Sequence, residues 1–242
     1  MLPESRETKP AIGVMAPHAG YVYSGPTAAD VFSRVEIPET IVILSPNHTG
    51  MGKPVSVWPD GAWQTPLGEV PVQATLSSLL LESDSGFEKD HDAHTREHAI
   101  EVQLPLLQYL REDIHIVPIT VFSQSPKNLI ALGTSLAQAI RKFDKPVLVV
   151  ASTDMTHFEN ARSAEEKDRL ALKRIQEMDP QGLIETVREN QISMCGYAPT
   201  AIMLQYAKEA GAATAEITGY TNSGDVSGDF NSVVGYAGAI LY

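Results

Sequence analysis

The chain is poor in cysteine, in positive charge and in long apolar runs, and each shortage excludes a class of protein. Its 242 residues contain one cysteine, so no disulfide forms within the chain and nothing requires an oxidising compartment. The 18 Lys and Arg against 30 Asp and Glu give a net charge of −12, which opposes binding to nucleic acid. The apolar runs are too short for a membrane span, and the first residues, MLPESRE, lack a signal-peptide core. We therefore expect a cytoplasmic protein that binds neither nucleic acid nor membranes.

What the sequence does contain is an alternation of short strand patterns and longer helical patterns. The strand patterns are rich in β-branched residues and fall at 11–16, 41–45, 114–121, 147–152, 215–220 and 233–241. The helical patterns fall at 24–35, 97–110, 126–143, 161–177, 180–189 and 199–210, and Pro105 is expected to kink the second. This alternation predicts one α/β domain over residues 1–242, with a mostly parallel sheet covered by helices on both faces. The Gly- and Pro-rich segment 50–71 is expected to be an irregular or hairpin insertion.

Histidines follow three of the predicted strands. His18 comes after the first strand, His48 after the second, and His157 after the strand that ends at residue 152. Ligands of such sheets bind beyond the carboxyl ends of the strands, so we expect the three imidazoles at one rim. Imidazoles gathered in this way suit a metal ion or acid–base chemistry.

The single cysteine, Cys195, lies just before the helix predicted at 199–210. A thiol near a helix N-terminus has its thiolate form favoured by the helix dipole. A free cysteine is equally common as a buried, inert apolar residue. The residues alone leave both interpretations open.

Two further patterns suggest metal chemistry less strongly. The segment from His94 to His98 matches the H-x-x-E-H pattern of inverted zinc peptidases, with Glu97 as the base. The polar stretch before it predicts that the helix begins at or after Thr95, which leaves His94 outside. The acidic segment 221–229 lacks the alternate carboxylates and closing glutamate of a calcium loop, so a turn before the last strand is expected there.

Six segments together resemble the signature blocks of the Memo family, whose bacterial and archaeal members are also called AmmeMemoRadiSam system protein B. The blocks occur in the family's order and cover nearly the whole chain. They are Ala16–Tyr21, Ser45–His48, Glu97–Pro105, Ser152–His157, Cys195–Pro199 and Ser223–Asp229.

The resemblance implies a fold similar to the class III extradiol dioxygenases, which use non-haem Fe(II) and O₂. It identifies His18 and His48 as metal ligands and places Cys195 where those enzymes have a glutamate. It also implies that His157 is the acid–base catalyst, with Asp154 beside it. The resemblance favours Fe(II) as the single ion, and the thiolate, a softer ligand than a carboxylate, also admits Cu or Zn.

The function expected from the resemblance is metal-dependent redox chemistry of the dioxygenase type on a small substrate. The alternatives are a non-catalytic module that binds a peptide or partner in the same pocket, and a zinc-dependent hydrolase. A protein of the radical-SAM system is the expected partner, and a homodimer is the commonest oligomer. Glu97, His98 and Glu101 are expected in the pocket wall or behind the ligands.

Overall fold

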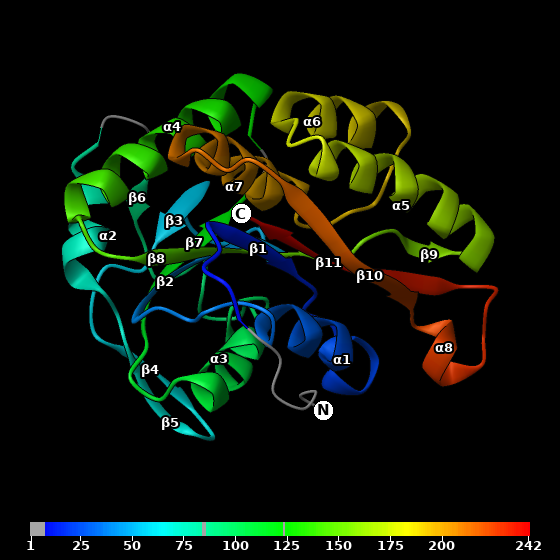
Figure 1. The fold of residues 1–242 in the computed structure, drawn as a ribbon, viewed down its shortest axis with the longest axis horizontal. Helices are drawn as coiled ribbons and strands as arrows, with labels where there is room; N and C mark the ends of the chain where they lie inside the picture. Colours follow the sequence, from blue (N-terminus) through cyan, green and yellow to red (C-terminus); the bar gives the residue numbers. More distant parts are fainter. Residues whose placement is uncertain (1–7, 84–85, 123) are drawn as a thin grey trace.

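The computed structural model describes residues 8–83, 86–122 and 124–242, and within them the chain forms one α/β unit around a central sheet (Figure 1). The strands of this sheet are β1 (Gly13–Ala16), β2 (Thr40–Pro46), β3 (Val55–Val57), β6 (Glu88–Lys89), β7 (His115–Val121), β8 (Val147–Ser152), β9 (His157–Glu159), β10 (Ala215–Asn222) and β11 (Val233–Leu241). Their order is β10-β11-β1-β8-β2-β7-β3-β6, and β9 pairs with β11.

The sheet is parallel in its centre and antiparallel towards its edges. Strands β1, β8, β2 and β7 run parallel to their neighbours in that group. Strand β11 is antiparallel to β1, β10 and β9, and β3 is antiparallel to β7. The predicted parallel sheet is therefore confirmed where strands are joined by helical crossovers. Among the antiparallel pairs, β10 and β11 are joined by the segment 223–232, which is shorter than a parallel crossover requires.

Helices cover both faces of the sheet, as predicted. They are α1 (Tyr21–Phe32), α2 (Ala74–Leu81), α3 (Leu104–Leu110), α4 (Pro126–Phe143), α5 (Ala161–Gln176), α6 (Pro180–Glu189), α7 (Tyr197–Ala210) and the short α8 (Gly224–Ser227). Helix α4 begins after a capping residue, Ser125, whose Oγ accepts the N–H of Asn128 at 3.2 Å. Helix α7 ends at Gly211, whose φ of 89° is the left-handed conformation that glycine adopts freely. The predictions did not include α2 or α8.

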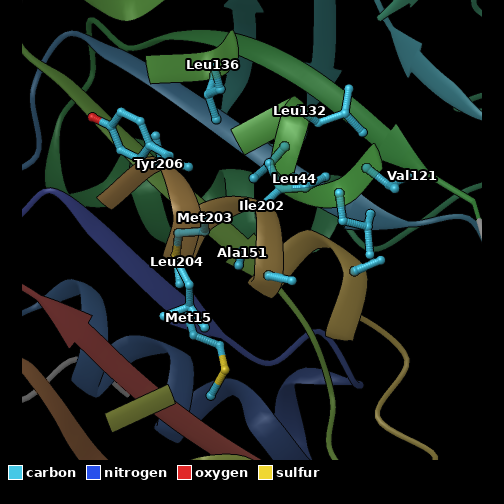
Figure 2. Packing of buried hydrophobic residues seen from close by; sticks show 14 of the residues in the cluster. Met15, Leu44, Val121, Leu132, Leu136, Ala151, Ile202, Met203, Leu204 and Tyr206 are labelled. Atoms are coloured by element: carbon cyan, nitrogen blue, oxygen red, sulfur yellow. The ribbon is translucent and has the colours of Figure 1, made fainter. Parts of the chain in front are cut away.

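Alternate residues of the central strands enter two different cores. On β1, Val14 faces the core under α1 and α3, whereas Met15 faces the core under α4 and α7. Figure 2 shows the second core, in which Ile202 and Met203 of α7 lie among side chains of the sheet and of α4. Burial on both faces explains why these strands are continuous apolar runs in the sequence.

The helix predicted at 97–110 is wrong in its first half. Helix α3 begins at Leu104, and a 3₁₀ turn at Glu101–Gln103 precedes it. Pro105 lies in the first turn of α3, where its missing N–H costs nothing, so it starts a helix and does not kink one. Glu97 and His98 consequently belong to a turn that packs against the loop after β2.

Two predicted irregular segments are confirmed as connections. Within 50–71, strands β4 (Ala62–Thr65) and β5 (Gly68–Pro71) form a separate hairpin, while β3 joins the main sheet. The acidic segment 221–229 contains α8 and connects β10 to β11, where Asp225 accepts the N–H of Asn222. No helix in the described part of the chain is long and apolar enough to cross a bilayer.

Candidate metal centre

The centre of the sheet brings together the three predicted metal ligands. Strands β1, β8 and β2 are neighbours, and His18 and His48 each lie two residues beyond the carboxyl end of a strand (Figure 1). One ligand atom each of His18, His48 and Cys195 lie within 4.8 Å of one another. The structure thus brings these three side chains together, and their role as metal ligands stays a prediction.

Cys195 reaches the cluster because the start of α7 packs closely on the end of β8. The N–H of Gly196 donates to Thr153 Oγ1 at 2.9 Å. A Cβ atom on Gly196 would lie 2.5 Å from the carbonyl oxygen of Ser152, closer than real contacts. Only glycine allows this approach, and the approach sets the position of the neighbouring thiol.

The hydrogen bonds of His18 fix which of its nitrogens is free. Ser152 Oγ donates to the carbonyl oxygen of Ala99 at 2.6 Å, so its oxygen accepts the Nδ1–H of His18 at 2.9 Å. The Nε2 atom carries the lone pair, and it lies 3.4 Å from Cys195 Sγ. Burial lowers the pKa of His18 to about 4, so the ring is neutral near pH 7. His18 is therefore in the form that binds metals.

Glu97 holds the ring of His48 by its Nδ1, as Ser152 holds that of His18. Its Oε1 lies 2.9 Å from His48 Nδ1 and its Oε2 accepts the backbone N–H of His48 at 2.6 Å. Burial acts to raise the pKa of Glu97, but the hydrogen bonds from His48 and Ala99 outweigh it and lower the pKa to about 2. An ionised carboxylate only accepts, so Nδ1 of His48 carries the proton and Nε2 is free. This is the carboxylate–histidine arrangement that orients metal ligands.

Cys195 is a neutral thiol in this environment. Burial, and then the charge of Asp154, raise the pKa of its thiol to about 12. The expected effect of the helix terminus, a favoured thiolate, is therefore outweighed by burial. The backbone N–H of Asp154 donates to Cys195 Sγ at 3.2 Å, and Asp154 Oδ1 accepts the N–H of His18 at 2.9 Å. Asp154 thus ties the loop after β1 to the segment that carries the thiol.

A third imidazole, His98, lies beside the two ligand histidines. Its ring stacks on His48 with centroids 5.2 Å apart, and its centroid lies 5.6 Å from that of His18. A second candidate metal group consists of His48, Glu97 and His98. The Nδ1 of His48 and both oxygens of Glu97 are already engaged in hydrogen bonds there, which favours the group with Cys195. The sequence indicated His98 only as part of the pocket wall.

His157 lies outside both candidate metal groups. Its strand, β9, pairs with β11, so the chain leaves the rim after Asp154. The ring contacts the segment before Cys195 in the chain, because His157 Nδ1 lies 3.0 Å from the carbonyl oxygen of Ser193. A carbonyl only accepts, so Nδ1 carries the proton and Nε2 has a lone pair. Its role as an acid–base catalyst stays a prediction.

His94, the first histidine of the H-x-x-E-H pattern, belongs to the sheet and not to the metal cluster. Its Nε2 lies 2.9 Å from Ser56 Oγ, and its Nδ1 lies 3.0 Å from Thr120 Oγ1. Burial lowers its pKa to about 4. Both nitrogens are used, so no lone pair is left for an ion. The peptidase interpretation is therefore not supported by this geometry.

Comparison with known proteins gives the same assignment as the six sequence blocks. The family model described as Memo-like protein matches residues 1–240. The chain belongs to the Memo family. A MEMO1 family protein of Thermotoga petrophila is 44% identical over 246 residues, which cover 100% of this chain and 87% of that protein. One from Methanopyrus kandleri is 42% identical, over 99% of this chain and 87% of the relative.

A solved structure shares this fold without close sequence similarity. An uncharacterised protein from Escherichia coli K12 matches with a TM-score of 0.64, over 94% of this chain and 98% of that one. Its sequence identity is 14%, so the likeness concerns the fold alone. The mixed sheet and its helical layers are thus a known architecture, whereas the metal cluster is inferred from this chain's own residues.

Proposed function

We propose that this Memo-family chain is a mononuclear transition-metal protein that carries out redox chemistry of the oxygenase type on a small substrate. His18, His48 and Cys195 would hold the ion. The observation that supports this most directly is that Nδ1 of each imidazole is engaged by Ser152 or Glu97, while one ligand atom of each ring lies within 4.8 Å of Cys195 Sγ. Two imidazoles and one thiol suit Fe(II), Cu and Zn, and we propose Fe(II) as the native ion.

The surrounding residues supply positioning and proton transfer. A bound iron or copper ion would provide one-electron chemistry and an open position for O₂ or substrate. Ser152 and Glu97 hold the two ligand rings by their Nδ1–H groups. His157 Nε2 is free to accept a proton from the substrate, and Asp154 fixes the loop that carries His18. The lone cysteine favours a reducing compartment, and we propose the cytoplasm.

The experiment that tests the site is metal loading of anaerobically purified protein with Fe(II), Cu(I) or Zn(II), each followed by elemental analysis. We expect one ion per chain, with binding lost in Cys195→Ala and in His48→Ala. His115→Ala is the matched control, because His115 lies at the opposite end of β7 and should bind metal normally. Retention of metal by the first two variants would show that the site is wrongly assigned.

Oxygen consumption tests the chemistry separately from the site. The Fe(II) or Cu form should consume O₂ when a reductant and candidate substrates are supplied, and His157→Ala should slow this without loss of the ion. Activity confined to the Zn form, with hydrolysis of added esters or amides, would indicate the hydrolase alternative.

A partner-binding role is the second candidate, because aromatic side chains are exposed near the cluster. Phe158 is 79% exposed and has a φ of 60°, which is unusual for a residue with a bulky side chain. Tyr21 and Tyr23, just after His18, are each 39% exposed. Under this alternative the occupant is a peptide or a radical-SAM partner protein. A binding module would keep its partner after His157→Ala and consume no O₂.

A further inference from the structure

A cavity of about 470 Å³ adjoins the metal cluster on the side of the β4–β5 hairpin. Glu97 and His98 line it, so they form a wall shared by the cavity and the cluster. Trp58, Trp63 and Arg96 line the remaining sides together with Glu101. The volume lies within the range of small-molecule sites, which is roughly 300–1,000 Å³.

Two indole rings form a corner in this cavity. The ring centroids of Trp58 and Trp63 are 5.5 Å apart and the rings are inclined by 73°. Both residues are partly exposed. Indole faces attract cations, and aromatic rings set at steep angles are the walls of sites that recognise ammonium groups. In the described part of the chain the one cation–π contact is Lys145 over Phe143, and the ring that packs against Trp58 is the imidazole of His91, with centroids 4.3 Å apart.

The charges around the cavity favour a positively charged ligand. Glu97 and the exposed Glu101 are two carboxylates, whereas Arg96 is the one guanidinium among the lining residues. The charge of Glu101 acts on neighbouring groups, since burial and then Glu101 raise the pKa of Tyr21. The net charge of −12 adds a negative background field.

We propose that this cavity binds a small organic cation, an amine or quaternary ammonium compound. The charged nitrogen contacts the faces of Trp58 and Trp63 and is attracted by Glu101. The remainder of the ligand extends towards His98, beside the metal cluster. The inference does not depend on the proposed metal chemistry, because binding is measured in metal-free protein.

The chain offers a direct reporter for this test. It contains two tryptophans, and both line the cavity, so all tryptophan emission comes from its wall. We would titrate the metal-free chain with benzyltrimethylammonium, and with phenylacetate and benzyl alcohol as anionic and neutral probes of similar size. We expect a saturable emission change with the cation, and binding of the other probes at least roughly tenfold weaker. No saturable change with the cation, or equal binding of phenylacetate, would overturn the proposal.

Variants then assign the binding to this cavity. Glu101→Gln should weaken binding of benzyltrimethylammonium roughly threefold or more, and Arg96→Ala should strengthen it. Trp58→Phe and Trp63→Phe each leave one reporter indole and should weaken binding, because phenyl rings attract cations less than indoles do. Glu112→Gln is the control, because Glu112 is an exposed carboxylate outside this cavity. Circular dichroism shows that each variant is folded, and an unchanged affinity in folded Glu101→Gln would contradict the assignment.

Discussion

His18 and His94 are two buried histidines that have similar exposure and similar pKa values but different hydrogen bonds. Their residues are 2% and 4% exposed, and burial lowers the pKa of each to about 4. His94 uses both nitrogens, because Ser56 accepts from one and Thr120 donates to the other. His18 uses one nitrogen and keeps the other for the cluster. A nitrogen that faces the cluster, and neither burial nor a shifted pKa, distinguishes the proposed metal ligand from the core residue.

The difference follows from where each ring lies relative to the sheet. Ser56 and Thr120 are on the paired strands β3 and β7, so His94 lies against hydroxyl groups that the ladder holds in place. His18 lies beyond the end of β1, where a hydroxyl group meets only its Nδ1 and the Nε2 faces the cluster. Strand ends therefore leave polar groups incompletely satisfied, which a ligand can use.

The largest effect on metal affinity should come from replacing the imidazole of His18 with the amide side chain of glutamine. His18→Gln removes a ligand and is expected to weaken metal binding by about three orders of magnitude, since a histidine–metal bond is lost. His94→Gln should leave the affinity within about threefold, because His94 touches no ligand. Competition titration with a chromophoric chelator measures both. Equal loss in the two variants would contradict the distinction between the two histidines.

Both histidines should make the folded protein less stable at acidic pH, because burial lowers the pKa of each ring. Their folded pKa of about 4 is below the ordinary value of 6.5, so between these pH values the unfolded chain binds more protons than the folded one. Stability of the metal-free protein should therefore fall as the pH drops from 6.5 to about 4, by at most about 3 kcal/mol for each ring. Glu97 raises the pKa of His48, so His48 takes up its proton above this window.

Urea unfolding at successive pH values measures this loss. In His94→Gln the proton uptake on unfolding should fall from about two to about one in this window. His115→Gln is the matched control and should leave the slope unchanged. If His94→Gln does not change how the unfolding free energy depends on pH, the buried ring is protonated in the folded state.

Glu97→Gln should have an intermediate effect on the metal cluster. The amide no longer carries the charge that holds the Nδ1–H of His48, and loss of such an orienting group typically costs 10- to 100-fold in metal affinity. Glu101→Gln is the control, since it removes a nearby charge without touching His48. Isothermal titration with Zn(II) measures both affinities, and similar losses would show that general charge, not orientation, matters.

The smallest effect should come from the hydroxyl behind His94. Thr120→Val keeps the shape of the side chain and removes the donor to His94 Nδ1, which should cost about 1–2 kcal/mol of unfolding free energy. Metal affinity should stay within about twofold. Thermal unfolding and the same chelator titration test this pair of outcomes, and a large loss of affinity would link the two histidine environments.

The sequence predicts most of the fold and the ligand grouping because both depend on the strands. The buried runs at β1, β2 and β8 are unmistakable, and the ends of adjacent parallel strands meet at one rim. His18 and His48 follow those ends directly, so their proximity is a consequence of topology. Cys195 needed the family resemblance, because its own pattern fits a buried apolar residue equally well.

The remaining features depend on contacts between distant segments, which no local pattern encodes. The pairing of Glu97 with His48 joins two loops that are 49 residues apart in sequence. The pairing of β9 with β11 takes His157 away from the ligands although it follows the same strand as Asp154. The sequence suggests a kink at Pro105 because it does not show that the helix begins only at Leu104, after a 3₁₀ turn.

The separation of the ligands along the chain also bears on how the protein folds. His18 and Cys195 are 177 residues apart, and His48 lies on a different strand connection from either. The cluster therefore forms only after the N-terminal strand, the middle of the sheet and α7 have all docked. Contacts of such long range form slowly, which makes ion capture one of the last events of refolding. The time at which a refolding chain first takes up metal should therefore report when the sheet is fully formed.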